Sequence, residues 1–146
     1  MEFALGREVI FIDSWVWLEY IFSGDKADEA KSLIERANTP AEGGLVAPTV
    51  LTEVSYRVRV VEDRNTADEA IRAIRDFEYI ESVPLVDEIA AYAAQLRFEY
   101  YEPGMRELSY ADAVHLATAI VHDDCTAFYS GDPDFRDVDE IETGIL

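Results

Sequence analysis

Four acidic residues occupy positions from which their carboxylates could act together on one substrate. Asp13 follows a short apolar run, Glu53 lies in the first half of a stretch with helical periodicity, Asp112 opens an apolar helix, and Asp132 lies in a Gly-Asp-Pro-Asp turn. Carboxylates that pack together repel one another unless a cation neutralises them. An all-oxygen cluster suits Mg²⁺ or Mn²⁺ better than Zn²⁺. Such ions activate water and stabilise charge on phosphates, as phosphodiester hydrolysis requires.

Two of these acids also have a purely structural explanation as helix caps. Asp13 or the adjacent Ser14 could cap the helix that follows the apolar run. Asp112 stands three positions after Ser109, which is the spacing of a capping box worth about 1 kcal/mol. The helix behind Asp112 is apolar nearly all round, so we expect it to be buried. An ionised carboxylate at its edge then needs a compensating donor or cation.

The other two acids have structural alternatives as well. Glu53 could pair with Arg57 one turn further along its helix, which is worth a few tenths of a kcal/mol. Asp132 and Asp134 flank a proline, and this composition is common in turns. The four acids are separated by 40, 59 and 20 residues. Their convergence therefore depends on the elements that carry them.

Strands that alternate with helices predict a three-layer α/β/α sandwich with a mainly parallel sheet. The expected strands cover residues 8–12, 45–47, 80–83, 126–129 and 140–145. The expected helices cover residues 15–22, 26–37, 48–62, 66–77, 86–102 and 109–120, the fourth opening with a Thr66–Glu69 capping box. No linker or repeat divides the chain, so we expect one domain over residues 1–146. Because the carboxyl ends of parallel strands share one edge, the four acids could meet there.

The composition is that of a folded but strongly acidic protein. Hydrophobic residues make up 49% of the 146 residues, which excludes a disordered chain, and the formal net charge is −19. Only two lysines accompany ten arginines, a usage that resembles proteins from salt-loving cytoplasms. This charge argues against nucleic acid as a partner. Screening at molar salt, where the Debye length is about 3 Å, and bridging by metal ions weaken that argument.

The remaining residue types add few further sites. Cys125 is the only cysteine, which excludes a disulfide framework and a thiolate metal cluster. Neither a signal peptide nor a membrane-spanning run is recognisable, so we expect a cytoplasmic protein with no membrane association. His122 is expected at a helix end, where the helix dipole favours it. His115, three positions after Asp112, could be a ligand but is interpreted as a structural residue.

Four short motifs resemble, in order and spacing, those of the PIN-domain ribonucleases, and in particular the VapC-type toxins of toxin–antitoxin pairs. The motifs are FIDS at 11–14, TE at 52–53, ADAVHLATA at 111–119 and SGDPDF at 130–135. The resemblance covers essentially the whole chain. It implies a parallel sheet flanked by helices, cleavage of RNA with Mg²⁺ or Mn²⁺, a homodimer, and a small antitoxin protein as partner.

The resemblance also assigns roles to individual residues. Asp13, Glu53, Asp112 and Asp132 match the acidic quartet, with Asp13 and Asp112 holding the main ion and Asp132 completing its shell. Glu53 would hold a second ion or orient the attacking water, and cleavage would leave a 5′-phosphate. Ser14 and Asp134 are auxiliary positions, and Asp134 remains an alternative to Asp132 as the fourth ligand. The candidates for holding RNA are Arg57, Arg59, Arg64 and Arg106.

Two other functions remain open at this point. A catalytically silent PIN-like binding or scaffold protein is compatible with the acidic surface. An aspartyl phosphotransfer domain is less compatible, because the phosphatase pattern needs a second Asp two positions after Asp13, where this chain has Trp15. The late lysine that a receiver domain would need is also missing.

Overall fold

A parallel sheet with helices on both faces makes up the protein, which a computed structural model describes over residues 7–146. Within these residues the sheet has five strands in the order β3-β2-β1-β4-β5, and all paired neighbours are parallel. The elements in chain order are β1 (Val9–Ile12), α1 (Ser14–Ile21), α2 (Ala27–Ala37), β2 (Gly44–Val46), α3 (Pro48–Val61), α4 (Arg64–Asp76), β3 (Ile80–Ser82), α5 (Asp87–Tyr100), α6 (Tyr110–Val121), β4 (Cys125–Ser130), η2 (Pro133–Phe135) and β5 (Glu142–Ile145).

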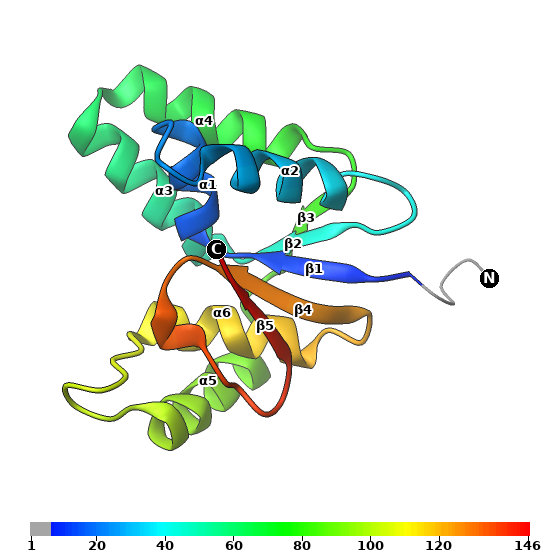
Figure 1. Ribbon diagram of the computed structural model, residues 1–146, viewed down its shortest axis with the longest axis vertical. Coiled ribbons are helices and arrows are strands. Elements are labelled where there is room, and N and C mark those ends of the chain that lie inside the picture. The colour runs from blue at the N-terminus through cyan, green and yellow to red at the C-terminus, as the bar shows by residue number, and fades with distance from the viewer. Residues whose placement is uncertain (1–6) are drawn as a thin grey trace.

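The helices divide into two layers around this sheet. Helices α1 to α4 lie on one side and helices α5 and α6 on the other, as Figure 1 shows. The chain first builds the half of the sheet from β1 to β3, and then returns through α5 and α6 to place β4 on the other side of β1. This arrangement confirms the predicted three-layer α/β/α sandwich. The carboxyl ends of β1 and β4 form a topological switch point, the usual binding crevice of such sheets.

The central position of β1 in the core explains why its sequence is an unbroken apolar run. All four of its residues are buried, because helices cover both faces of the central strand. Phe11 stacks on Phe128 of the neighbouring strand with ring centroids 5.1 Å apart, and Phe128 in turn packs against Phe135. These contacts fix the end of β1 relative to the end of β4 and the turn that follows.

The start of α4 differs from the prediction. The expected Thr66–Glu69 capping box is wrong: Asp63 is the N-cap, and its Oδ1 accepts a hydrogen bond of 2.7 Å from the backbone N–H of Thr66. A stronger cap thus lies three residues upstream, and the helix begins at Arg64. By contrast, the Ser109–Asp112 capping box is confirmed, with both reciprocal hydrogen bonds present.

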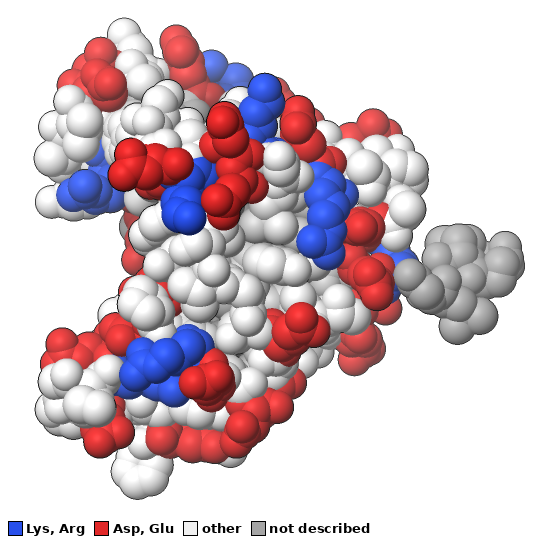
Figure 2. All heavy atoms as spheres, in the orientation of Figure 1, with Lys and Arg blue, Asp and Glu red and all other residues white. Residues whose placement is uncertain are grey.

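The surface carries the charge that the composition requires. Acidic side chains are spread over the face drawn in Figure 2, and the molecule is hollowed between its α3–α4 side and its α5–α6 side. Among the helices of residues 7–146, none has both the length and the apolar character needed to cross a membrane.

Candidate functional site

Asp13 lies at the switch point, directly after β1, and its side chain is almost completely buried at 5% exposure. It occupies the N-cap position of α1, but its side chain makes no capping hydrogen bond. Instead, Oδ1 lies 2.9 Å from Nδ1 of His115, and Oδ2 accepts a hydrogen bond of 2.8 Å from the hydroxyl of Ser130. The carboxylate is therefore held by residues of α6 and β4, and the simple capping explanation does not account for it.

Glu53 approaches the same place from α3. Its Oε1 accepts a hydrogen bond of 2.7 Å from the hydroxyl of Ser14 and lies 3.8 Å from Nε2 of His115. The Glu53 side chain is 35% exposed, so it combines a fixed oxygen with access to solvent. Within residues 7–146 the basic side chain beside it is that of His115, not Arg57, and the alternative of a local Glu53–Arg57 pair is not realised.

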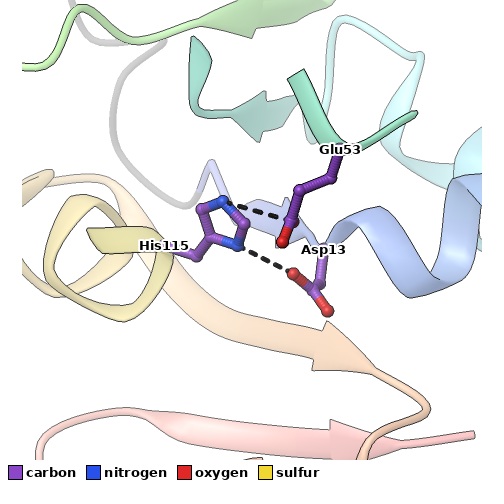
Figure 3. Close-up of side chains that lie close together, drawn as sticks. All are labelled: Asp13, Glu53 and His115. Atoms are coloured by element: carbon purple, nitrogen blue, oxygen red, sulfur yellow. Dashed lines mark hydrogen bonds and ion pairs between the residues drawn. The ribbon is translucent and has the colours of Figure 1, made fainter. Parts of the chain in front are cut away.

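Asp13, Glu53 and His115 form the group drawn in Figure 3. Each offers one ligand atom, and these atoms lie within 4.8 Å of one another. The two carboxylates are ligands that suit Mg²⁺ or Mn²⁺, whereas an imidazole nitrogen is a more typical ligand of the later transition metals. The chemistry of the side chains therefore fits a divalent cation at this point of the sheet.

Asp112 lies beside this group but is engaged at its helix end. Its Oδ2 accepts a hydrogen bond of 3.0 Å from the backbone N–H of Ser109. Burial, reinforced by the negative charge of Asp13, raises the pKa of Asp112 to about 6 from its ordinary value of 3.8. Hydrogen bonds from Ser109 and the proximity of His115 oppose this rise. Asp112 is thus both a capping acid and a member of the electrostatic environment of Asp13.

Asp132 is connected to Asp13 through a single buried hydroxyl. Ser130 Oγ donates to Asp13 and also accepts a hydrogen bond of 3.0 Å from the backbone N–H of Asp132. Oδ1 of Asp132 caps the short η2 helix by accepting from the backbone N–H of Asp134 at 2.9 Å. The side chain of Asp134 lies 3.9 Å from the guanidinium of Arg136. The hydrogen bonds of this turn therefore explain part of the motif at residues 130–135. They also place Asp132 next to the site.

The candidate RNA-binding arginines lie in different surroundings. Arg57, Arg59 and Arg64 are exposed on α3 and at the start of α4. Arg106 is partly buried, and its guanidinium carbon lies 5.1 Å from the centre of the Tyr100 ring. Its Nη1 is buried without a hydrogen-bond partner among the described residues. Three of the four are therefore exposed to solvent, with Arg64 3.8 Å from a carboxylate oxygen of Asp68, while Arg106 is packed into the α5–α6 connection.

His115 was named from the sequence as a possible ligand but interpreted as a structural residue, and the structure places it in the site. The ring is fully buried, as a packing residue would be, but both nitrogens face polar partners at the switch point. The available signal was its position one helical turn after Asp112, on a helix otherwise almost without polar residues. A buried imidazole requires hydrogen-bond partners, and the nearby acids were the candidates.

The fold and this group of side chains define an α/β/α protein with an acidic centre at the switch point of a parallel sheet. The chain belongs to the PIN-domain family, whose model matches residues 10–141. A comparison with curated protein sequences gave no significant match.

Solved structures with the same fold come from several bacteria. VapBC2 from Rickettsia felis, bound to a DNA fragment from its promoter, is similar with a TM-score of 0.72 and 13% identity, over 93% of this chain and 97% of that one. Mycobacterium tuberculosis VapC20, described as a Sarcin-Ricin loop cleaving toxin, has a TM-score of 0.69 and 23% identity, over 86% and 92%. A DNA-bound VapBC from Salmonella typhimurium has a TM-score of 0.67 and 14% identity, over 94% and 97%. At these identities the similarity shows a shared fold.

Proposed function

We propose that this protein is a divalent-metal-dependent endoribonuclease and the toxin of a VapBC-type toxin–antitoxin pair. The observation that carries the proposal is the placement of Asp13, buried at the switch point, unused as a cap and grouped with Glu53. The PIN family and the VapC structural neighbours favour RNA over other phosphodiesters. In this proposal the cation is Mg²⁺ or Mn²⁺, held by Asp13 and Glu53 with Asp112 and Asp132 beside them.

The side chains would divide the work of hydrolysis between them. A cation bound there would supply charge stabilisation at the phosphate and lower the pKa of an attacking water. Glu53, which reaches solvent while Ser14 fixes one of its oxygens, would accept the proton of that water. The water oxygen forms the new bond to phosphorus, and the bond from phosphorus to the 3′ oxygen breaks. The products are a 5′-phosphate and a 3′-hydroxyl that takes its proton from solvent.

Substrate binding would use the exposed arginines of the α3–α4 side. Arg57 and Arg59 lie on the helix that carries Glu53, so their side chains can reach an RNA backbone that enters from that side. Arg106 is a weaker candidate because it packs against Tyr100. Because the surface is acidic, RNA binding should depend on few contacts between arginines and phosphates. The affinity for RNA should fall with added salt, and the steepness of that fall should follow the number of these contacts.

Partners are proposed on the same basis. Structural neighbours include VapBC complexes and a toxin–antitoxin complex from Klebsiella pneumoniae, which supports a small antitoxin protein as partner. A homodimer is compatible with the exposed apolar residues of α3, since Tyr56, Val60 and Val61 are 66%, 60% and 52% exposed. Sedimentation of the Tyr56→Ser, Val60→Ser double variant tests the homodimer: it should be monomeric where the wild-type protein is dimeric.

The central experiment compares Asp13→Asn with a matched control. Wild-type protein with Mn²⁺ should cleave single-stranded RNA to 5′-phosphate products, and a chelator should stop the reaction. Asp13→Asn should reduce cleavage at least about a hundredfold while the protein remains folded. The control variant Asp123→Asn makes the same change at an exposed residue just before β4 begins, at the end of that strand away from Ser130. This variant should cleave normally. Normal cleavage by Asp13→Asn would refute the proposal, and absence of Mn²⁺ binding in calorimetry would favour a silent scaffold.

A further inference from the structure

The ring of His115 connects three elements at the proposed site. It projects from α6, is fully buried, and meets Asp13 at the end of β1 through Nδ1 at 2.9 Å. Its other nitrogen, Nε2, lies 2.8 Å from the hydroxyl of Thr49 in the first turn of α3. Figure 3 shows the ring between Asp13 and Glu53, with one nitrogen facing each carboxylate. The imidazole therefore spans the gap between the sheet edge and the helix that carries Glu53.

The hydrogen-bond partners of His115 determine which ring nitrogen carries a hydrogen and which accepts one. An ionised carboxylate only accepts hydrogen bonds, so Nδ1 carries the hydrogen that faces Asp13. In the neutral ring Nε2 is then an acceptor, and the hydroxyl of Thr49 donates to it. Both nitrogens are in use and neither faces solvent. A cation could bind Nε2 only by displacing Thr49, whereas the oxygens of Asp13 and Glu53 keep lone pairs for it.

We propose that His115 is a positioning residue rather than a metal ligand: its Nδ1–H orients the carboxylate of Asp13, and its Nε2 ties Thr49 and the start of α3 to the same point. The inference rests on the proposed function, because the oriented carboxylate is the one assigned to the cation. Hydrogen bonds to ligating groups typically change metal affinity ten- to a hundredfold when removed. His115 would thus set how well Asp13 binds the ion.

Two variants of His115 distinguish the roles of Nδ1 and Nε2. In His115→Asn the side-chain amide can occupy the place of Nδ1 and keep the hydrogen bond to Asp13, while Thr49 loses its acceptor. In His115→Gln the amide reaches the place of Nε2 and keeps Thr49, while Asp13 loses its donor. We expect the Asn variant to bind Mn²⁺ within about threefold of wild type, and the Gln variant at least about tenfold more weakly. A metal ligand at Nε2 predicts the opposite ranking, which would overturn the inference.

A structural role alone would not produce this ranking, and a control checks that point. Thr118→Val removes a buried hydroxyl from the same helix, which among residues 7–146 donates to the Val114 carbonyl at 2.7 Å and has no other partner. It should leave Mn²⁺ affinity unchanged even if the melting temperature falls. Equal weakening by Thr118→Val and His115→Gln would overturn the inference, because general loosening of α6 would then explain both.

The wild-type protein offers a measurement that no folding defect can obscure. Long-range ¹H–¹⁵N NMR of the full chain should show Nδ1 of His115 as the protonated nitrogen and Nε2 as the bare one. Thr49→Val should move the Nε2 resonance, and Thr49→Ser should restore it. A hydrogen on Nε2 with a bare Nδ1 would overturn the inference. Failure of the proposed function has a different signature, since the wild-type protein would then not bind Mn²⁺ at all.

Discussion

The hydroxyl of Ser14 donates a hydrogen bond of 2.7 Å to Oε1 of Glu53, a residue 39 positions further along the chain. Ser14 opens α1 and Glu53 lies in α3, so this contact joins the first turn after β1 to the helix after β2. One oxygen of Glu53 is thereby fixed, while the side chain keeps access to solvent. Ser14 therefore contributes to the site through Glu53.

Removal of the Ser14 hydroxyl should lower activity more than stability. We expect Ser14→Ala to reduce RNA cleavage roughly tenfold, because Glu53 becomes free to rotate away from its position. The melting temperature should change little, since the neighbouring backbone contacts remain. Ser14→Thr, which keeps a hydroxyl, should recover most of the activity. Initial cleavage rates of the three proteins at equal Mn²⁺ provide the measurement, and full activity of the Ala variant would contradict this role.

Replacement of Asp112 by Asn should stabilise the metal-free protein, and the gain should depend on pH. The folded-state pKa of about 6 lies above the ordinary 3.8, so ionisation of Asp112 opposes folding. Wild-type stability associated with this group is complete below about pH 4 and is lost as the pH rises through 6. The Asn variant does not ionise, so its advantage should be small at pH 4 and full at pH 7.5.

The size of this gain has an upper bound. A shift of this extent corresponds to at most roughly 3 kcal/mol, at about 1.4 kcal/mol per pKa unit. Since Asp112 is partly exposed, solvent screening reduces the expected gain to the order of 1 kcal/mol. Urea unfolding at both pH values, with a chelator present, measures the difference between the two proteins. Equal stability of the two proteins at pH 7.5 would show that Asp112 ionises without penalty in the fold.

Loss of the Ser130 hydroxyl should destabilise the protein and the site together. Ser130→Ala would remove a donor from buried Asp13 and an acceptor from the backbone of Asp132. Buried polar groups left without partners cost about 1–3 kcal/mol, so the free energy of unfolding should fall by that amount. Ser82→Ala, at the exposed end of β3, should change it by less than about 0.5 kcal/mol. Equal effects of the two substitutions in urea unfolding would argue against the bridging role of Ser130.

Cys125 should be unreactive in the folded protein at neutral pH. Burial raises the pKa of its thiol to about 11 from 9.0, so the thiolate that attacks alkylating reagents is scarce below pH 9. Iodoacetamide at pH 8, followed by mass spectrometry, should leave most of the folded protein unlabelled. The same treatment in urea should label it completely. Rapid labelling of the folded protein would place the thiol in a more open environment than the structure gives it.

Much of the fold could be predicted because local signals agreed with the overall arrangement. The apolar run of β1 and the Ser109–Asp112 capping box each specify one element on their own. The start of α4 was misplaced because the Thr66–Glu69 spacing of a capping box was given more weight than the stronger N-cap preference of Asp63.

The edge of the sheet where the site lies was predictable from the sequence, but the contacts between individual side chains were not. The placement of Asp13 and Glu53 near each other follows from where β1 and β2 end. The contacts of His115 depend on how α6 is rotated against β1, and the rotation follows from side-chain packing across 102 residues of sequence separation. Whether Asp112 and Asp132 bind a cation stays a prediction for the experiments above.

The pairing of β1 with β4 has a consequence for biosynthesis. Asp13 leaves the ribosome early, but its partner Ser130 is 117 residues further on. A nascent chain therefore carries the first carboxylate long before it can complete the site around it. If the protein is a toxin, the incomplete nascent chain is therefore inactive. Activity begins only when β4 has left the ribosome and paired with β1.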